Sequence, residues 1–164
     1  MGPAGAIIMS FFAAVFCVGA LWNDPTVSHA WLLLPVAVSA SIMVQAFRLL
    51  KDAPSPDDAE SKRIGRVIMW SSIAEGIGIF LAVNICVNLR ADARLWPAIA
   101  LVVGLHFLPM AYSIPFRRFY VLSAGLIGVA IIGMLIPAAF AARVGGIGGA
   151  VGLWTASIWA VRRV

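Results

Sequence analysis

The sequence predicts an all-α protein, an integral membrane bundle of six transmembrane helices with both termini in the cytoplasm. The 164 residues are 62% apolar and only 12% charged, which is about half the charged fraction of a soluble domain. Apolar runs of about 18 residues or more recur along the whole chain, as membrane-spanning helices require. The basic residues cluster at the ends of these runs, where they set topology and contact lipid head groups, so nucleic acid is a poor candidate partner.

The first two helices are expected at Ala4–Trp22 and Ala30–Phe47, separated by the turn sequence Asn23-Asp24-Pro25. No Lys or Arg precedes the first apolar run, and its length of about 19 residues exceeds the apolar region of a signal peptide, so we expect a helix. The segment Arg48–Arg66 contains Pro54-Ser55-Pro56-Asp57-Asp58 and is too charged to enter the bilayer. It is predicted to be a cytoplasmic loop.

The third helix is expected at Val67–Leu89, and a five-residue turn then makes it an antiparallel hairpin with the fourth, which starts at Pro97 and ends near Ile114. The fifth helix is expected at Phe119–Ile136. The sixth covers Gly145–Val161 or, in the alternative, starts at Pro137. Residues 1–164 thus form a single transmembrane domain, and a five-helix arrangement would have to discard one well-formed apolar run.

Orientation follows from the basic residues, because Lys and Arg are enriched in cytoplasmic loops. With six spans, nine of them share the side of the termini: Arg48, Lys51, Lys62, Arg63, Arg66, Arg117, Arg118, Arg162 and Arg163. The opposite side has three: Arg90, Arg94 and Arg143. The sequence therefore predicts a multi-pass protein of the bacterial cytoplasmic (inner) membrane, with the lipid bilayer as its first partner.

Glu75 is the only acid within the long apolar runs. An ionisable group near the bilayer centre costs about 3 kcal/mol on insertion scales, so such residues are enriched at functional sites. Ser71, Gly78 and Ala82 follow helical spacing with it and share its face of the third helix. A small, partly polar stripe of this kind faces protein or water rather than lipid.

His106 is the expected partner of Glu75. It lies eight residues before the inner end of the fourth helix at Ile114, and Glu75 lies eight residues after the inner start of the third at Val67. At 1.5 Å per residue both are about 12 Å from the cytoplasmic ends of neighbouring antiparallel helices. Pro109 removes the hydrogen bond to the carbonyl of Leu105, next to His106. The spacing predicts that the two side chains meet.

The residues of this hairpin also carry a resemblance. Ser72-Ile-Ala-Glu75-Gly-Ile-Gly-Ile, followed by Val103-Gly-Leu-His106-Phe-Leu-Pro109-Met-Ala, resembles a pattern in small multi-pass bacterial membrane proteins with a VGLHFLPMA-type motif. That resemblance covers only the third and fourth helices. It implies that Glu75 and His106 belong together, and it implies no activity or substrate.

Three hypotheses of function follow. The leading one is proton-linked transport or binding of a small solute, with Glu75 as the titrating group, His106 as its partner, and Ser71 and Ser72 as further binding candidates. The second is an intramembrane enzyme that acts on a lipid or isoprenoid by acid–base chemistry, which is less favoured because few deep polar groups are present. The third is a scaffold or assembly partner in the membrane, in which a Glu75–His106 contact only holds the hairpin together.

The remaining features predict packing rather than chemistry. A small-residue stripe on the sixth helix predicts close helix packing, either within the bundle or across a homodimer: Gly148, Gly152, Ala156 and Ala160. Cys17 and Cys86 are expected near the same membrane face, where they form either a bridge or two buried thiols. Two histidines, one deep acid and two distant thiols do not make a metal site, and no cofactor is expected.

Overall fold

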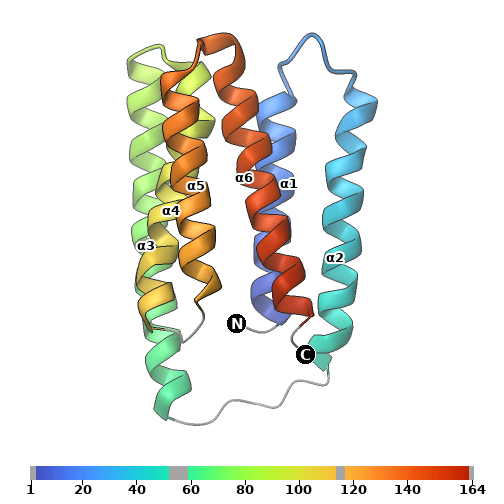
Figure 1. Ribbon diagram of the computed structural model, residues 1–164, viewed down its shortest axis with the longest axis vertical. Helices are drawn as coiled ribbons and strands as arrows, with labels where there is room; N and C mark the ends of the chain where they lie inside the picture. The colour runs from blue at the N-terminus through green and yellow to red at the C-terminus, as the bar shows by residue number, and fades with distance from the viewer. Residues whose placement is uncertain (1–2, 52–58, 114–116, 163–164) are drawn as a thin grey trace.

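The computed structural model describes residues 3–51, 59–113 and 117–162, and within these ranges the chain forms six long α-helices (Figure 1). Their bounds are α1 Pro3–Leu21, α2 Leu33–Lys51, α3 Ala59–Asn88, α4 Leu95–Ser113, α5 Arg118–Leu135 and α6 Ala138–Val161. Two short 3₁₀ turns, η1 His29–Leu32 and η2 Asp92–Arg94, precede α2 and α4. All six helices, two of them counted with these turns, are long and apolar enough to cross a membrane.

The helices run alternately up and down, so α1 begins and α6 ends at the same end of the bundle (Figure 1). The helix α1 packs mainly on α6 and α2, whereas α3 packs mainly on α4, and α5 joins α4 to α6. As a result α2 and α3 lie at the two outer edges of the bundle (Figure 1). Because α3 buries the smallest share of its length among the six, most of its surface faces outward.

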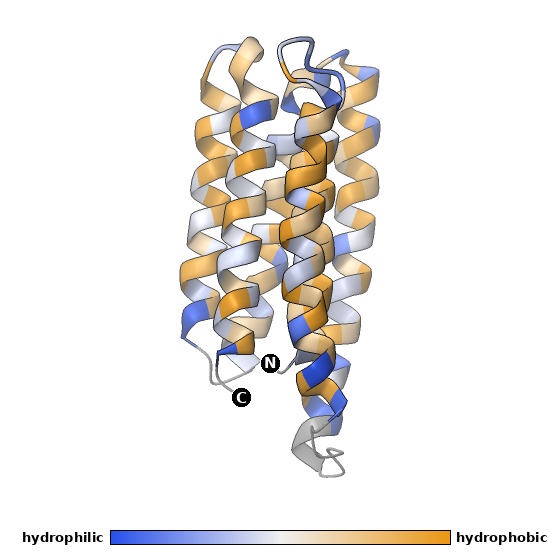
Figure 2. Ribbon diagram, turned by 90° about the vertical axis from the view of Figure 1, so that its right-hand side faces the viewer, coloured by the Kyte–Doolittle hydropathy of each residue, from blue (hydrophilic) through white to orange (hydrophobic). Residues whose placement is uncertain are grey.

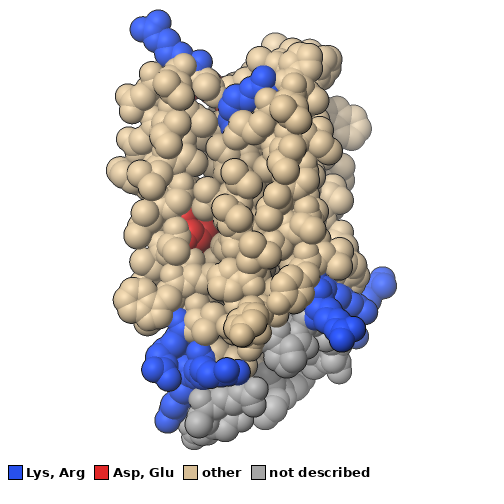
Figure 3. Space-filling view, turned by 60° about the vertical axis from the view of Figure 1, so that its left-hand side comes forward, with Lys and Arg blue, Asp and Glu red and all other residues tan. Residues whose placement is uncertain are grey.

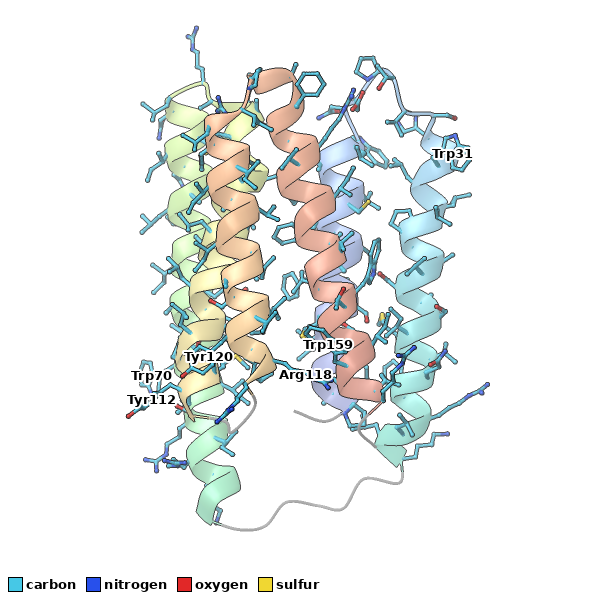
Figure 4. All side chains as sticks on the ribbon, viewed as in Figure 1. Trp31, Trp70, Tyr112, Arg118, Tyr120 and Trp159 are labelled. Carbon is cyan, nitrogen blue, oxygen red and sulfur yellow. The ribbon has the colours of Figure 1, made fainter. Side chains whose placement is uncertain are left out.

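The outer surface is that of a membrane protein. Hydrophobic residues cover most of the length of the helices, and hydrophilic residues gather toward their ends (Figure 2). At the end that holds the termini lie four aromatic side chains, Trp70, Tyr112, Tyr120 and Trp159, while Trp31 lies at the opposite end (Figure 4). Trp and Tyr are enriched at both water interfaces of a bilayer, so these side chains are consistent with membrane-spanning helices, and which end lies in the cytoplasm stays a prediction.

The structure corrects the bounds of the predicted loop. The prediction made all of Arg48–Arg66 a loop, but α2 continues to Lys51 and α3 already begins at Ala59. Charge excludes a segment from the bilayer without excluding it from a helix, since Glu, Lys, Arg and Ala are good helix formers. The turn chemistry expected at residues 52–58 and the end of the fourth span at Ile114 lie outside the described residues.

The start of α6 decides between two predicted alternatives. The helix begins at Ala138 with Pro137 as its N-cap, so the earlier start is correct and Gly145 lies two turns inside the helix. The glycines of the segment Gly145–Gly149 are compatible with a helix because they face close neighbours. A Cβ on Gly146 would lie 2.0 Å from the Cβ of Ala20, which shows how closely α6 approaches α1.

The predicted small-residue stripe lies inside the bundle. Ala156 and Ala160 are buried, and a Cβ on Gly148 would lie 2.7 Å from Cγ1 of Val129 on α5. A Cβ on Gly152 would meet only ordinary van der Waals neighbours there, the nearest at 3.5 Å. The stripe thus serves packing within one chain, and the homodimer remains a prediction without this surface to support it.

An ion pair and hydrogen bonds stabilise the end of the bundle opposite the termini. Asp24, in the connection after α1, accepts hydrogen bonds from Nε and Nη2 of Arg143 on α6, the latter at 2.8 Å. Together with bonds from Thr26 they hold the pKa of the Asp24 carboxyl well below its usual range. Arg94 donates to the carbonyls of Gly133 and Ile136, at 2.6 and 2.7 Å. These bonds join the first connection to α6 and the η2 turn to the end of α5.

One further prediction concerns the two cysteines, and a tryptophan adds a contact between helices. Cys17 and Cys86 are both free and buried, so of the two alternatives the structure has the buried thiols. Trp154, which is not part of either aromatic belt, donates from Nε1 to Oγ of Ser39 at 2.8 Å. That bond satisfies the indole N–H within the bundle and ties α6 to α2.

Candidate functional site

The structure brings Glu75 and His106 together at the α3–α4 contact. Nδ1 of His106 lies 3.5 Å from Oε2 of Glu75, and the two side chains are 8% and 15% exposed. Close approach of the helices makes this contact feasible, because a Cβ on Gly78 would already lie 2.7 Å from Cγ1 of Val102. The meeting expected from matched depths in the sequence is therefore present.

Ser71, one turn before Glu75 on α3, fixes the imidazole. Its Oγ lies 2.9 Å from Nδ1 of His106 and 3.0 Å from the backbone oxygen of the same residue. A hydroxyl has one hydrogen to donate, so both contacts are satisfied when Ser71 donates to the carbonyl and accepts from Nδ1–H. In that arrangement the N–H is used by Ser71, and Oε2 of Glu75 lies 3.5 Å from the same nitrogen as its ionic neighbour.

This geometry differs from a nucleophile–base–acid relay. In such a relay the serine contacts one imidazole nitrogen and the acid contacts the other, so that a proton passes through the ring. Here Ser71 and Glu75 both approach Nδ1 of His106. The three residues form an orienting cluster, and the arrangement does not activate Ser71 as a nucleophile.

A cavity of about 270 Å³ lies beside the Glu75–His106 pair, and we call it the α1–α3 cavity. Its walls come from α1, α3, α4 and one residue of α6: Gly5, Ile8, Met9, Phe12, Ile68, Ser72, Glu75, Gly76, Ile79, Val103, His106, Phe107, Met110 and Leu153. Apart from Ser72, Glu75 and His106 the lining side chains are apolar or absent. The cavity joins an apolar volume to one small polar patch.

A second cavity of about 260 Å³ adjoins the same pair, and we call it the α3–α4 cavity. It is lined by Ser71, Ala74, Glu75, Gly78, Val102, Leu105, His106 and Pro109. Glu75 and His106 alone belong to both linings. Because a helix turns by about 100° per residue, these two residues lie at the boundary between the helix faces that border each cavity.

The site opens on the side of the bundle. Ile8, in the wall of the α1–α3 cavity, is 58% exposed on the outer surface, and the flanking helices α1 and α3 each pack mainly on other helices. Figure 3 shows an acidic surface recessed in the uncharged middle of the molecule, between basic groups at both ends. The Glu75 side chain is 15% exposed and lines this cavity, so the acid is reachable from the side of the bundle.

Ser72 and Gly76 line the α1–α3 cavity without joining the Ser71–Glu75–His106 cluster. Ser72 is exposed in the wall of the α1–α3 cavity, without a hydrogen bond to any described residue. Gly76 also borders this cavity, and a Cβ there would meet nothing within 4 Å. Of the four predicted site residues, the structure joins Ser71, Glu75 and His106 into one cluster and places Ser72 beside it.

Sequence reasoning missed the contribution of α1. Met9 and Phe12 line the same cavity as Glu75, but the one serine of the otherwise apolar α1, Ser10, does not line it, so the sequence carries no sign of which face of α1 borders a cavity. Phe107 was also missed, although it directly follows His106. Its ring lies edge-on to the imidazole with centroids 5.2 Å apart, and it stacks on Phe119 with centroids 5.6 Å apart.

Among the residues that the structure describes, no group of three or more His, Cys, Asp or Glu side chains is placed to hold a metal ion. The polar groups at the site can donate or accept hydrogen bonds, carry a proton, or pair with a charge. Comparison with protein-family models, curated proteins and solved structures found no match to this chain. The resemblance of the third and fourth helices therefore stays a prediction.

Proposed function

We propose that this chain binds a small solute within the membrane at the Glu75–His106 pair and couples its binding or transport to the movement of a proton. The observation that carries the proposal is the incomplete pairing of Glu75. Within the described part of the chain its carboxyl has one polar neighbour, Nδ1 of His106 at 3.5 Å, and it borders a 270 Å³ cavity. A buried polar group without its full set of partners is costly, so an occupant that supplies the missing contact is stabilised.

The pair supports coupling because proton and solute compete for one carboxyl. When Glu75 carries a proton, it has no charge to attract a cation and offers a hydrogen-bond donor instead. When it gives the proton to water or to His106, it becomes an acceptor for a donor or positive group of the solute. Its place at the boundary of two cavities provides two sides from which it can be reached.

The other two functions have less support. Acid–base chemistry on a lipid would also use a site that opens sideways, but such an enzyme needs more than one proton-transfer group positioned around a reacting atom. The cluster supplies two such groups, Glu75 and His106, but they contact each other through Nδ1 and Ser71 is committed to the imidazole, so no further polar group of the cluster is left to position a reacting atom between them. A scaffold would be favoured by a closed bundle in which Glu75 is fully paired, and neither condition holds at this site.

The test of coupling uses purified protein in liposomes with entrapped pyranine, a pH-sensitive dye. Three probes of matched shape are added under a pH gradient: 3-phenylpropylamine, 3-phenylpropanol and 3-phenylpropanoic acid. At least one is expected to cause protein-dependent proton movement that Glu75→Gln abolishes and Asp92→Asn, a neutralised acid of the η2 turn, retains. Equal proton movement in the wild type and in Glu75→Gln for every probe would contradict the proposal.

We also propose that the chain lies in the bacterial cytoplasmic membrane with both termini inside, because nine of its basic residues belong to the end that holds them. A green fluorescent protein fused after residue 164 is then expected to fluoresce, while alkaline phosphatase fused there stays inactive. The same reporters inserted after Asp92 should give the reverse pattern. Active phosphatase at the C-terminus would overturn this orientation.

A further inference from the structure

We propose, resting on the binding function above, that the solute is a small lipophilic amine whose protonated nitrogen pairs with Glu75 while its apolar body fills the α1–α3 cavity. The charges around the cavity favour this class. Among the described residues no Lys or Arg lines either cavity. The polar groups that face the α1–α3 cavity are a carboxyl, an imidazole and a hydroxyl, and none of them is a permanent cation that would hold an anion.

A cation also resolves the electrostatic problem of the site. A carboxylate in apolar surroundings is unfavourable unless an opposite charge or several hydrogen bonds compensate it. His106 is the one titratable side chain near Glu75 among the described residues, and its Nδ1 is shared with Ser71. A protonated amine supplies the opposite charge and up to three N–H donors, whereas an alcohol supplies a single donor and no charge.

Two aromatic rings strengthen the preference for a cation. Phe12 and Phe107 belong to the lining of the same cavity as Glu75, and the face of an aromatic ring attracts an ammonium group within about 6 Å. Phe107 is held in place by its stacking on Phe119. Its ring is therefore fixed before a ligand arrives.

The volume of the α1–α3 cavity and the route into it define the rest of the ligand. At about 30 Å³ per water-sized group, 270 Å³ holds about nine non-hydrogen atoms, which corresponds to one aromatic ring and a short alkyl chain. The other lining residues are apolar, so they match a hydrocarbon body. Because the wall includes Ile8, which is exposed on the outer surface, the ligand enters from the bilayer between α1 and α3.

Equilibrium binding to the full chain in dodecyl maltoside micelles tests this class. Radiolabelled 3-phenylpropylamine is displaced by the unlabelled amine, by 3-phenylpropanol and by 3-phenylpropanoic acid. We expect the amine to bind about tenfold more tightly than the alcohol, since a hydrogen bond to a charged group contributes more than a neutral one, and the acid to bind most weakly. Glu75→Gln should remove the advantage of the amine, whereas Asp92→Asn, which neutralises an acid of the η2 turn outside the linings of both cavities, should keep it.

The outcomes distinguish failure of the amine proposal from failure of the binding function itself. If the alcohol binds as tightly as the amine and both are lost in Glu75→Gln, the amine is wrong and the binding function stands. If no probe binds saturably, or binding is the same in Glu75→Gln, both proposals fail. Should Glu75→Gln not fold, wild-type protein modified at Glu75 with dicyclohexylcarbodiimide replaces it, and amine binding that persists after modification overturns the proposal.

An ammonium group is also present in some lipid headgroups. A further competition experiment identifies whether the bound amine is a lipid headgroup or a free molecule. Phosphatidylethanolamine or phosphatidylglycerol is added to the micelles during amine binding. Competition by phosphatidylethanolamine alone would assign the cavity to a headgroup amine, whereas the absence of competition by either lipid would assign it to a free amine. Both results keep the ammonium class, and equal competition by both lipids would contradict it.

Discussion

Ser71 and Ser72 are neighbours in the chain, but the helix directs their hydroxyl groups to different surroundings. Ser71 is buried and bonds His106 twice, whereas Ser72 is exposed at the cavity wall. We expect Ser71→Ala to lower the free energy of unfolding by about 0.5–1.5 kcal/mol, the net contribution of a hydrogen bond. Ser72→Ala should change it by less than about 0.5 kcal/mol. Thermal unfolding in detergent micelles measures both, and equal effects would contradict the orienting role of Ser71.

For individual residues, the sequence could predict that Glu75 and His106 meet, but not which side chains surround them. Counting residues from the helix ends places Glu75 and His106 at the same depth, because helical rise is constant. That Ser71 would reach both Nδ1 and the carbonyl of His106 depends on the rotation of each helix about its axis, and one sequence does not determine this. The same holds for Phe12, whose position in the same cavity as Glu75 results from how α1 packs on its neighbours.

The helix α6 shows how the spacing of small residues relates to packing. The predicted stripe takes every fourth residue from Gly148 to Ala160, but a helix has 3.6 residues per turn, so such a stripe drifts around the helix by about 40° at each step. Gly148 and Gly152 consequently face α5, and the closest approach to α1 is made instead by Gly146, whose added Cβ would lie 2.7 Å from the backbone oxygen of Phe16. The sequence identified a closely packed helix, and the structure adds a second, tighter contact with α1 that the stripe does not include.

A matched pair of substitutions on α6 tests which of its two contacts, with α1 or with α5, is the more tightly packed. Gly146→Ala must displace backbone and Cβ atoms of α1, so it should destabilise the bundle by about 1–3 kcal/mol, as overpacking does. Gly152→Ala meets its nearest neighbour, a Leu126 methyl group, at 3.5 Å, and the gain in helix propensity of up to about 1 kcal/mol should leave it neutral or more stable. Thermal unfolding of the two variants compares them. A larger loss for Gly152→Ala would favour the predicted stripe as the critical contact.

For the whole molecule, the site depends on an unequal distribution of packing. The helix α1 is held by α6 and α2, and α3 is held mainly by α4, so these two helices border a common space without filling it. Six spans and their order follow from the lengths of the apolar runs. The cavity does not follow from them, because in a bilayer both lipid-facing and protein-facing surfaces are apolar, and hydropathy therefore gives little information on which faces meet.

The end of the bundle opposite the termini depends on a charged contact that links distant parts of the chain. Asp24 accepts two hydrogen bonds from Arg143, and Thr26 bonds both partners. The pKa of Asp24 is lowered in the folded protein. The stabilisation is therefore complete above the unfolded pKa of about 4 and is lost as the pH falls through the lower, folded value.

Asp24→Asn should consequently unfold at a lower temperature than the wild type at about pH 7, and the difference should shrink as the pH falls below about 4, where the wild-type carboxyl of the unfolded chain is protonated. Asp92→Asn removes an acid from the η2 turn that has no ion pair with a described residue, so it should show no such narrowing. Unfolding midpoints of the three proteins across this pH range measure the effect. The ion pair joins the first connection to α6. If the difference in unfolding midpoint between Asp24→Asn and the wild type stays constant with pH, the shape of the side chain rather than its charge stabilises this end of the bundle.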